Sequence, residues 1–487
     1  MENKLLNKLK NKVSKYGFII KPVIYISIIF AIAISAIIRA NFNYKDDLRR
    51  VAIGYMGWSN YSRYLSSFLS FFMHTDLYLT DISPLPQLIA VCMMALAGVI
   101  ILYVYKESKS FSIMDIIAII PLGLSPFFLE CFSYKYDAPY MALSVLISVF
   151  PLLFRKKNNW IYSSMIIIST LIMCMTYQAS SGIFLMLVLL IGLKKWNECE
   201  NIKETLKFLA ISFGSYLGGL LIFKLFMMKP ADTYVSNKII PIAELIPKSV
   251  ENFKEYFSLI LSWFKKEWII LVVLIGIFFV YVYTRDSKRK KYFAFPISII
   301  GLILMLLLSF GMYPFLTKPL FAPRSMYGFG VFIALIGVAI STSKKAYIGK
   351  LSVIILSWIF FVFSFTYGNA LEVQKQYTDF RVNLVIDDLN DLEVMTTNKI
   401  KGIQITGSIG ISPILRNMPQ DYQMLNNLVP VQFKGNWDWG EYYFYNYFDL
   451  KNIKKSYNLK TYDLPILKDT MYHTIKGNDK YILIELK

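Results

Sequence analysis

Histidine and cysteine are scarce in this chain, and their scarcity limits the chemistry it can perform. The 487 residues include two histidines, His74 and His473, and four cysteines. Two histidines so far apart argue against a His-rich metal site. The cysteines have no metal-ligand spacing and mostly lie in or beside apolar segments, so we interpret them as small apolar packing residues. They are Cys92, Cys131, Cys174 and Cys199.

Charge is also low. Only 17% of the residues are charged and 56% are hydrophobic, whereas a soluble domain of this length needs more charge to cover its surface. The net charge of +20 could indicate a nucleic-acid partner. Lys and Arg instead gather in short runs between apolar stretches, which is typical of loops at an anionic inner leaflet. We therefore predict a multi-pass membrane protein that contacts membrane lipids and no nucleic acid.

Eleven apolar runs predict the architecture. The first, residues 17–38, is long enough to cross ~30 Å of hydrocarbon, and no small-residue cleavage site clearly ends it, so we predict a retained helix. Ten more runs begin near Leu85, Ile113, Ala138, Trp160, Gly182, Leu206, Trp268, Phe293, Met326 and Leu351. Basic clusters lie in alternate connections, at residues 106–109, 155–157, 194–195, 285–291 and 344–345. With these clusters inside, the chain crosses a bacterial cytoplasmic membrane with its N-terminus inside and its C-terminus outside.

Three domains follow from this pattern. Residues 1–16 alternate Lys with apolar residues and predict a basic amphipathic helix on the inner leaflet. Residues 17–367 form the transmembrane domain of about 11 helices. Residues 368–487 have ordinary polarity and predict a small extracytoplasmic α/β domain, with a helix near 380–392 and strands at 402–406 and 481–486.

Two external connections contain aromatic residues at helical spacing. One is residues 61–72, between the first and second runs, and the other is residues 250–264. Both predict helices that lie flat in the outer interface.

The first candidate site is a pair of carboxylates after the first helix. Asp46 and Asp47 are followed by Arg50, so a potential base lies beside a potential phosphate ligand. Glycosyl transfer from a lipid phosphate needs a carboxylate to take the proton of the acceptor hydroxyl and cations to stabilise the departing phosphate. The alternative is an ordinary solvated loop with no catalytic role.

A second cluster lies where the third run meets the external surface. Glu130, Tyr134 and Asp137 are spaced so that a helical turn would place them on one face, and Lys135 adds a cation. We predict that these residues bind substrate. An interfacial aromatic turn is the alternative, but it explains Glu130 poorly.

Other candidates are spread along the chain. Gln178 is a candidate substrate ligand, and Arg324 at an external helix end is a candidate ligand of the donor phosphate, with snorkelling toward lipid headgroups as its alternative. Trp437 and Trp439 belong to a dense aromatic stretch and predict a glycan-binding surface. Packing of the domain against the membrane helices is the competing interpretation.

Short motifs in this order resemble the O-antigen glucosyltransferase II family. They are Asp46-Asp47-x-x-Arg50, Gly54-Tyr-Met-Gly-Trp58, Leu129-Glu-x-x-Ser-Tyr-x-x-Asp137, Tyr177-Gln178 and Pro323-Arg324. The C-terminal domain matches no motif. The resemblance implies a GT-C-type transferase that moves glucose from undecaprenyl phosphate to a cell-surface polysaccharide outside the cytoplasmic membrane. It also implies catalysis by the acidic pair Asp46 and Asp47.

Several alternatives stay open at this level. The acidic residues suit Mg²⁺ or Mn²⁺, but they equally suit direct hydrogen bonds to sugar. The Ile-, Lys- and Asn-rich composition favours a wall polysaccharide or teichoic acid as the acceptor, and we expect a donor synthase and a flippase as functional partners. Rival functions are a lipid-linked sugar flippase, a polysaccharide transporter and a polymerase. A transporter predicts polar residues along a central path or an inverted repeat, but these residues gather at one face and no internal repeat is evident.

Overall fold

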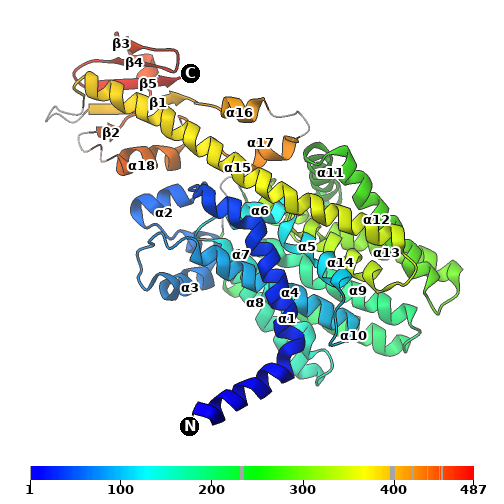
Figure 1. Ribbon diagram of the computed structural model, residues 1–487. Helices are drawn as coiled ribbons and strands as arrows, with labels where there is room; N and C mark the ends of the chain where they lie inside the picture. The colour runs from blue at the N-terminus through cyan, green and yellow to red at the C-terminus, as the bar shows by residue number, and fades with distance from the viewer. Residues whose placement is uncertain are drawn as a thin grey trace.

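Long apolar helices dominate the computed structural model (Figure 1). The structure describes residues 2–230, 235–394, 401–417, 422–435, 437–448, 450 and 453–487, without the side chains of residues 2–16 and of a few residues after 438. The helices of the bundle are α1 (Glu2–Ala40), α4 (Leu85–Lys106), α5 (Ile113–Leu124), α6 (Pro126–Ser133), α7 (Ala138–Val149), α8 (Asn159–Thr176), α9 (Ile183–Asn197), α10 (Ile202–Phe226), α12 (Lys266–Arg285), α13 (Lys291–Leu308), α14 (Gly328–Thr342) and α15 (Tyr347–Asp391).

Each predicted apolar run is helical, but the structure supports a smaller count of crossings than eleven. Within the described residues, eight helices are long and apolar enough to span a membrane. The number is nine if α5 and α6, which meet at a bend of 58°, form one broken span. The helical segments at 138–154 and 328–342 are shorter than a full crossing. The chain is a polytopic helical protein of the membrane type.

The connections also contain the predicted short helices. α2 (Asp47–Ile53), the 3₁₀ helix η1 (Trp58–Tyr61) and α3 (Tyr64–His74) lie between α1 and α4, and α11 (Leu245–Trp263) lies between α10 and α12. The helices predicted at 61–72 and 250–264 are therefore confirmed as α3 and α11. α2 ends at Gly54, which has a φ of +60° and donates its N–H to the carbonyl of Arg50. Glycine favours this left-handed helix end.

The segment between α5 and α7 is broken twice. Ser125 is extended because it precedes Pro126, and this bends α6 away from α5. α6 then ends at Tyr134, which is also extended, and α7 begins after Asp137. Glu130, Tyr134 and Asp137 thus do not share one helix face.

The C-terminal region is a small α/β unit. Its sheet has the order β2-β1-β5-β4-β3, with β1 parallel to β2 and β5 and the other pairs antiparallel. The strands are β1 (Lys401–Gly407), β2 (Ile453–Lys455), β3 (Ile466–Asp469), β4 (His473–Gly477) and β5 (Tyr481–Leu486). The helices are α16 (Pro413–Arg416), α17 (Gln423–Leu428) and α18 (Asp438–Tyr447). The strands predicted at 402–406 and 481–486 are confirmed as β1 and β5, which are direct neighbours.

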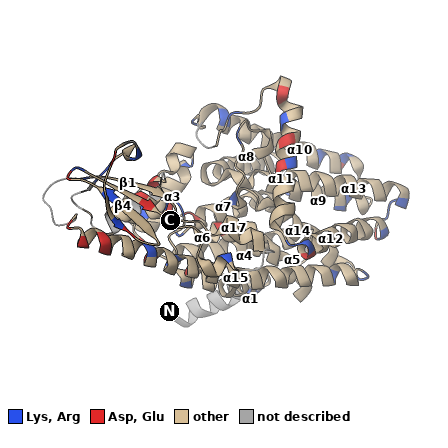
Figure 2. Cartoon of the chain, turned by 90° about the horizontal axis from the view of Figure 1, so that it is seen from above, with Lys and Arg blue, Asp and Glu red and all other residues tan. Residues whose placement is uncertain are grey.

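α15 joins the bundle to the sheet without interruption. Its first part packs against α1, α5 and α12, and its last turns bury Val382, Val385 and Leu389 against the sheet (Figure 1). The predicted domain boundary at residue 368 falls inside this helix, and the helix predicted at 380–392 is its end. Figure 2 shows the bundle largely without charge, with Lys, Arg, Asp and Glu at its ends and over the C-terminal region.

α17 fastens the C-terminal region to the bundle a second time. Leu425 and Leu428 belong to the main hydrophobic core. The Leu428 carbonyl accepts hydrogen bonds from the hydroxyls of Tyr44 (2.8 Å) and Tyr367 (3.3 Å). The Gln432 amide also donates to the Asn43 carbonyl. The loop that leads from α1 into α2 is therefore held by the C-terminal region.

Candidate functional site

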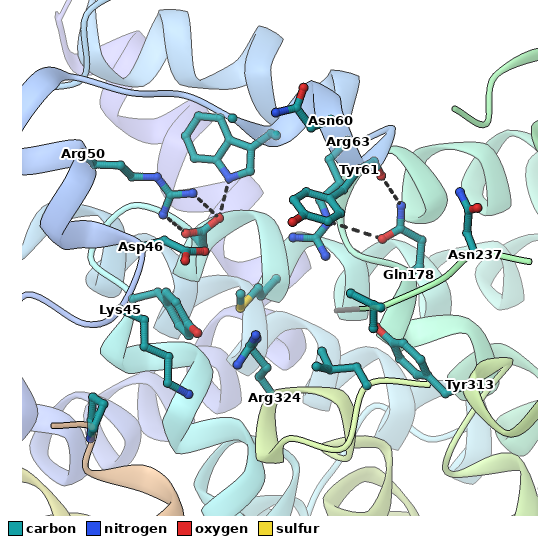
Figure 3. Close-up of a pocket in the computed structure, with 18 of the residues that line it drawn as sticks. Lys45, Asp46, Arg50, Asn60, Tyr61, Arg63, Gln178, Asn237, Tyr313 and Arg324 are labelled. Atoms are coloured by element: carbon teal, nitrogen blue, oxygen red, sulfur yellow. Dashed lines mark hydrogen bonds and ion pairs between the residues drawn. The ribbon is translucent and has the colours of Figure 1, made fainter. Parts of the chain in front are cut away.

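A cavity of about 830 Å³ lies between the end of the bundle and the C-terminal region (Figure 3). Its lining combines parts of the chain that are far apart in sequence. They are residues 45–63, 134–141, Gln178, 223–237, 313–324 and 411–437, each contributing some of its members.

Asp46 and Asp47 have opposite environments. Asp46 is exposed on the cavity wall, and its carboxylate makes no hydrogen bond or ion pair with a described residue. Asp47 is fully buried behind the wall, where it accepts the backbone N–H groups of Tyr44 (3.2 Å) and Lys135 (2.9 Å). Burial raises the pKa of Asp47 to about 7, against the lowering effect of Arg50. Of the two predicted bases, Asp46 faces the cavity, and Asp47 ties the start of α2 to the turn before α7.

Arg50 and Asp137 form a buried pair on the same wall. Both terminal nitrogens of Arg50 contact the Asp137 carboxylate, with 3.2 Å between Nη2 and Oδ1, and the Trp58 indole N–H donates to the same carboxylate. The guanidinium lies 4.7 Å from the Trp58 ring. This bidentate arrangement neutralises much of the Arg50 charge and fixes α2 to α7.

Glu130 is the counter-charge beneath two cavity cations. It is fully buried and does not line the cavity. Its carboxylate accepts from Lys45 Nζ (2.6 Å) and Arg324 Nη1 (3.2 Å), and also from the Arg324 backbone N–H (2.5 Å). Tyr134 lines the cavity, 5.8 Å from the Arg324 guanidinium. The predicted ligand Glu130 is thus placed to hold cations in position and not to touch substrate directly.

Lys135 does not reach the cavity. Its ammonium group is buried, donates to the Asn43 side chain at 2.8 Å and pairs with Asp81 at 3.0 Å. These contacts connect the turn before α7 to the loop after α1, so the structure places Lys135 in the support of the site.

Gln178 orients a cation that the sequence interpretation missed. Its amide nitrogen donates to the backbone carbonyls of Tyr61 (3.0 Å) and Cys174 (2.8 Å). This fixes its side-chain oxygen, which accepts from Arg63 Nε at 3.3 Å. Gln178 and Arg63 both line the cavity (Figure 3).

The C-terminal region contributes the opposite wall. Trp437 lines the cavity, and Lys434 lies 5.3 Å from its ring. The side chain of Trp439 lies outside the described residues, and Phe444 from the same aromatic stretch is buried in the domain core. The aromatic stretch is therefore divided between cavity and core. Other residues of this wall are Ile411, Asn426, Asn427, Val429, Pro430 and Val431.

A family model described as glucosyl transferase GtrII matches residues 35–335. The chain belongs to this glucosyltransferase family. A relative from Salmonella phage P22, named as an uncharacterized 55.3 kDa protein in the gtrB 5' region, is 26% identical over 424 residues. The similarity covers 82% of this chain and 84% of the phage protein. No match was found among solved structures.

Membership of the GtrII family confirms the resemblance predicted from the short motifs and supports a glycosyltransferase. The matched span begins near the end of α1 and ends within α14. It therefore contains Asp46, Arg50, Asp137 and Arg324, and it stops before the C-terminal wall of the cavity.

Three cavity cations of this GtrII protein were missed from sequence. Lys45 could have been found, since it directly precedes Asp46 and the first motif. Arg63 is the single Lys or Arg between Arg50 and Lys106, which is a signal of its own. Lys434 carries no comparable signal. Within the described chain, no group of three or more His, Cys, Asp or Glu side chains could hold a metal ion, and the choice between Mg²⁺ or Mn²⁺ and direct hydrogen bonds to sugar, left open from sequence, stays open.

Proposed function

We propose that this GtrII-family protein transfers glucose from an undecaprenyl-phosphate donor to a cell-surface polysaccharide at the extracytoplasmic face. The main support for this proposal is that the accessible carboxylate of Asp46 lines the same cavity as Arg50, Arg63 and Arg324. A base and a set of cations in one cavity are the two requirements of transfer from a sugar phosphate.

The proposed reaction is a single displacement. Asp46 accepts the proton of the acceptor hydroxyl while that oxygen forms a bond to the anomeric carbon. The bond from this carbon to the phosphate oxygen breaks, and the phosphate leaves with the electron pair. Cavity arginines stabilise the charge that develops on it. Attack opposite the leaving group inverts the anomeric configuration.

Other cavity residues have supporting roles in this scheme. Arg324 and Arg50 remain candidate ligands of the donor phosphate. Tyr134 offers a ring and a hydroxyl that has no hydrogen-bond partner among the described residues. Asp137 and Gln178 are candidate sugar ligands, although their present contacts to Arg50 and Arg63 make positioning their more direct role.

The basic clusters support the extracytoplasmic placement. Arg155 contacts Glu107 at 2.5 Å, and Lys194 donates to the Tyr105 carbonyl at 2.7 Å. Lys288 and Arg289 in turn bond the backbone of residues 196–197. The basic clusters, which lie in alternate connections between helices, thus come together at one end of the bundle. α8 runs from this end to Gln178 in the cavity, so the cavity lies at the other end, which the positive-inside rule assigns to the outside.

The test is transfer by the full-length protein in proteoliposomes, with undecaprenyl-phosphate glucose and the surface polysaccharide. Asp46→Asn keeps the shape of the side chain but removes its basicity, so transfer should fall at least ~10²-fold. Asp479→Asn, at an exposed residue that does not line the cavity, is the matched control and should transfer normally.

Two outcomes would overturn the proposal. Near-normal transfer by Asp46→Asn would show that Asp46 is not the catalytic base. Use of a nucleotide sugar or a diphosphate-linked lipid in place of the monophosphate would show that the proposed donor is wrong. Mass spectrometry of the surface polysaccharide from a deletion strain gives an independent readout, since one hexose per repeat should be lost.

A further inference from the structure

The cavity cations differ in how far they are neutralised. Arg50 is paired with Asp137, and Lys45 and Arg324 share Glu130. Among the described residues, neither Arg63 nor Lys434 of the opposite wall has a carboxylate within ion-pair distance. The Arg63 guanidinium contacts an uncharged amide and two tyrosine rings, and unlike the Lys434 ammonium it is a planar fork. An incoming anion must compete with existing carboxylates at the first three cations, but not at Arg63.

We infer that Arg63 is the principal ligand of the donor phosphate, an inference that rests on the proposed function. Its guanidinium is preorganised: Tyr177 lies beneath it at 4.4 Å, and Gln178 holds its Nε. Both donors of the Gln178 amide are used by backbone carbonyls, so this amide cannot turn away. Because Nε is occupied, the two terminal nitrogens remain to donate in parallel to two phosphate oxygens.

The surroundings of Arg63 suit a lipid-linked phosphate. Phe223 and Met228, at the end of α10, line the cavity with it. Ser62 accepts the backbone N–H of Lys229 at 2.8 Å, so the end of α10 lies beside the start of α3.

Both helices carry large apolar side chains on their outer surfaces here. On α3, Phe68 and Phe72 are 59% and 61% exposed, and on α10, Phe226 is 80% exposed. Arg63 thus lies where a polar cavity meets apolar surface, which is the junction between a phosphate and a prenyl chain.

This arrangement separates two tasks among the arginines. Arg63 binds the phosphate, and the Arg50–Asp137 pair positions α2 and the Asp46 carboxylate. Gln178 acts through Arg63 as a positioning residue. Arg324 lines the same cavity, but part of its own charge is neutralised by Glu130.

The experiment measures binding of undecaprenyl phosphate to the full-length protein in nanodiscs, with undecaprenol as the uncharged probe of the same tail. Wild type should bind the phosphate at least ~10-fold more tightly than the alcohol. Arg63→Gln should lose this preference while its affinity for undecaprenol stays unchanged. Arg63→Lys keeps the charge but not the fork, so it should lose less. Arg39→Gln, an exposed arginine outside the cavity, is the control and should bind like wild type.

The outcomes separate this inference from the proposed function. If wild type prefers the phosphate and both Arg63 variants keep that preference, Arg63 is not the ligand although the proposed donor stands. If wild type shows no preference, the proposed donor fails and the inference fails with it. Asp46→Asn should bind undecaprenyl phosphate normally although its transfer falls at least ~10²-fold, so a loss of binding in this variant would contradict the division of tasks. Should Arg63→Gln fail to fold, the Arg63→Lys variant decides: an unchanged preference overturns the inference, and a reduced one supports it.

Discussion

The two walls of the cavity differ in chemistry. The wall built by the bundle holds Asp46 and buried ion pairs, including Arg50–Asp137 and Arg324–Glu130. The wall built by the C-terminal region offers amides, apolar side chains, Trp437 and Lys434, and its described lining residues include no carboxylate. This difference fits the proposed function, in which the reaction takes place at the bundle wall, and we expect the C-terminal wall to contact the acceptor. The GtrII family model covers the first wall and not the second.

The largest effect should come from breaking a buried pair in the bundle wall. Asp137→Ala removes the carboxylate that Arg50 and Trp58 contact and leaves a buried guanidinium without its bidentate partner. Loss of one partner of a buried pair costs about 3–5 kcal/mol, so the apparent Tm of the purified protein should fall clearly. Asp438→Ala removes an exposed partner of Lys455 on the C-terminal side and should leave Tm nearly unchanged. Equal decreases in Tm for the two variants would contradict the expected difference in stability between the two walls.

A smaller effect, confined to donor use, is expected at Arg324. Arg324→Ala should reduce transfer at least ~10-fold, and Arg324→Lys should reduce it less because the planar fork is lost but the charge is kept. Kinetics at varied donor concentration check this. The change should appear in the donor dependence and leave the acceptor KM unaltered. Normal donor use by Arg324→Ala would show that Arg324 is not a ligand of the donor phosphate.

Trp437→Ala tests the role of the C-terminal wall. If this ring stacks on the acceptor chain, its loss should slow transfer to the native polymer roughly 3- to 10-fold and spare a short acceptor mimic, because one aromatic contact is worth ~0.5–1.5 kcal/mol. Protease resistance reports whether the variant is folded. A folded variant with unchanged transfer to the polymer would contradict glycan binding, and a uniform loss on both acceptors would indicate a packing role.

The smallest effect concerns pH. Burial raises the pKa of Asp47 to about 7 in the folded protein, so the folded state holds a proton there between pH ~4 and 7 that the unfolded chain has lost. Stability from this group therefore decreases as pH rises through that window. Relative to Asp47→Asn, wild type should gain apparent Tm as pH is lowered from 8 to 5. A difference in Tm that does not depend on pH would mean that Asp47 is ionised throughout.

The fate of Asp46 and Asp47 shows how far sequence predicts this site. Hydropathy located every helix of the bundle except α6, because a segment buried in lipid must be apolar along its whole length, but it overestimated the number of full crossings. It could not tell the two aspartates apart, since they are adjacent and identical. Their roles are decided by the Lys135 backbone N–H, which comes from a turn 88 residues later and binds Asp47. Helical spacing was also a poor guide around Glu130, because Pro126 and the extended Tyr134 interrupt the helix.

The C-terminal wall of the cavity could not be predicted from the sequence for a different reason. Its position depends on a single helix of 45 residues and on α17, whose apolar residues join the core of the bundle. Neither feature has a local pattern that distinguishes it from an independent domain attached by a linker. Arg63 stands alone in its stretch of sequence, but that isolation does not show that its guanidinium faces a cavity and has no carboxylate partner among the described residues.

The attachment of α17 has a consequence for chimeric proteins. Tyr44, two residues before Asp46, donates to the Leu428 carbonyl, and Gln432 reaches the Asn43 carbonyl. A chimera that takes its whole C-terminal region from a relative, in order to change the acceptor, would therefore also change the residues that hold the loop before Asp46. Grafting residues 434–437 alone leaves these contacts with their original partners. Relatives that diverge in acceptor should accordingly vary at 434–437 while Asn43, Tyr44 and Gln432 change together or not at all.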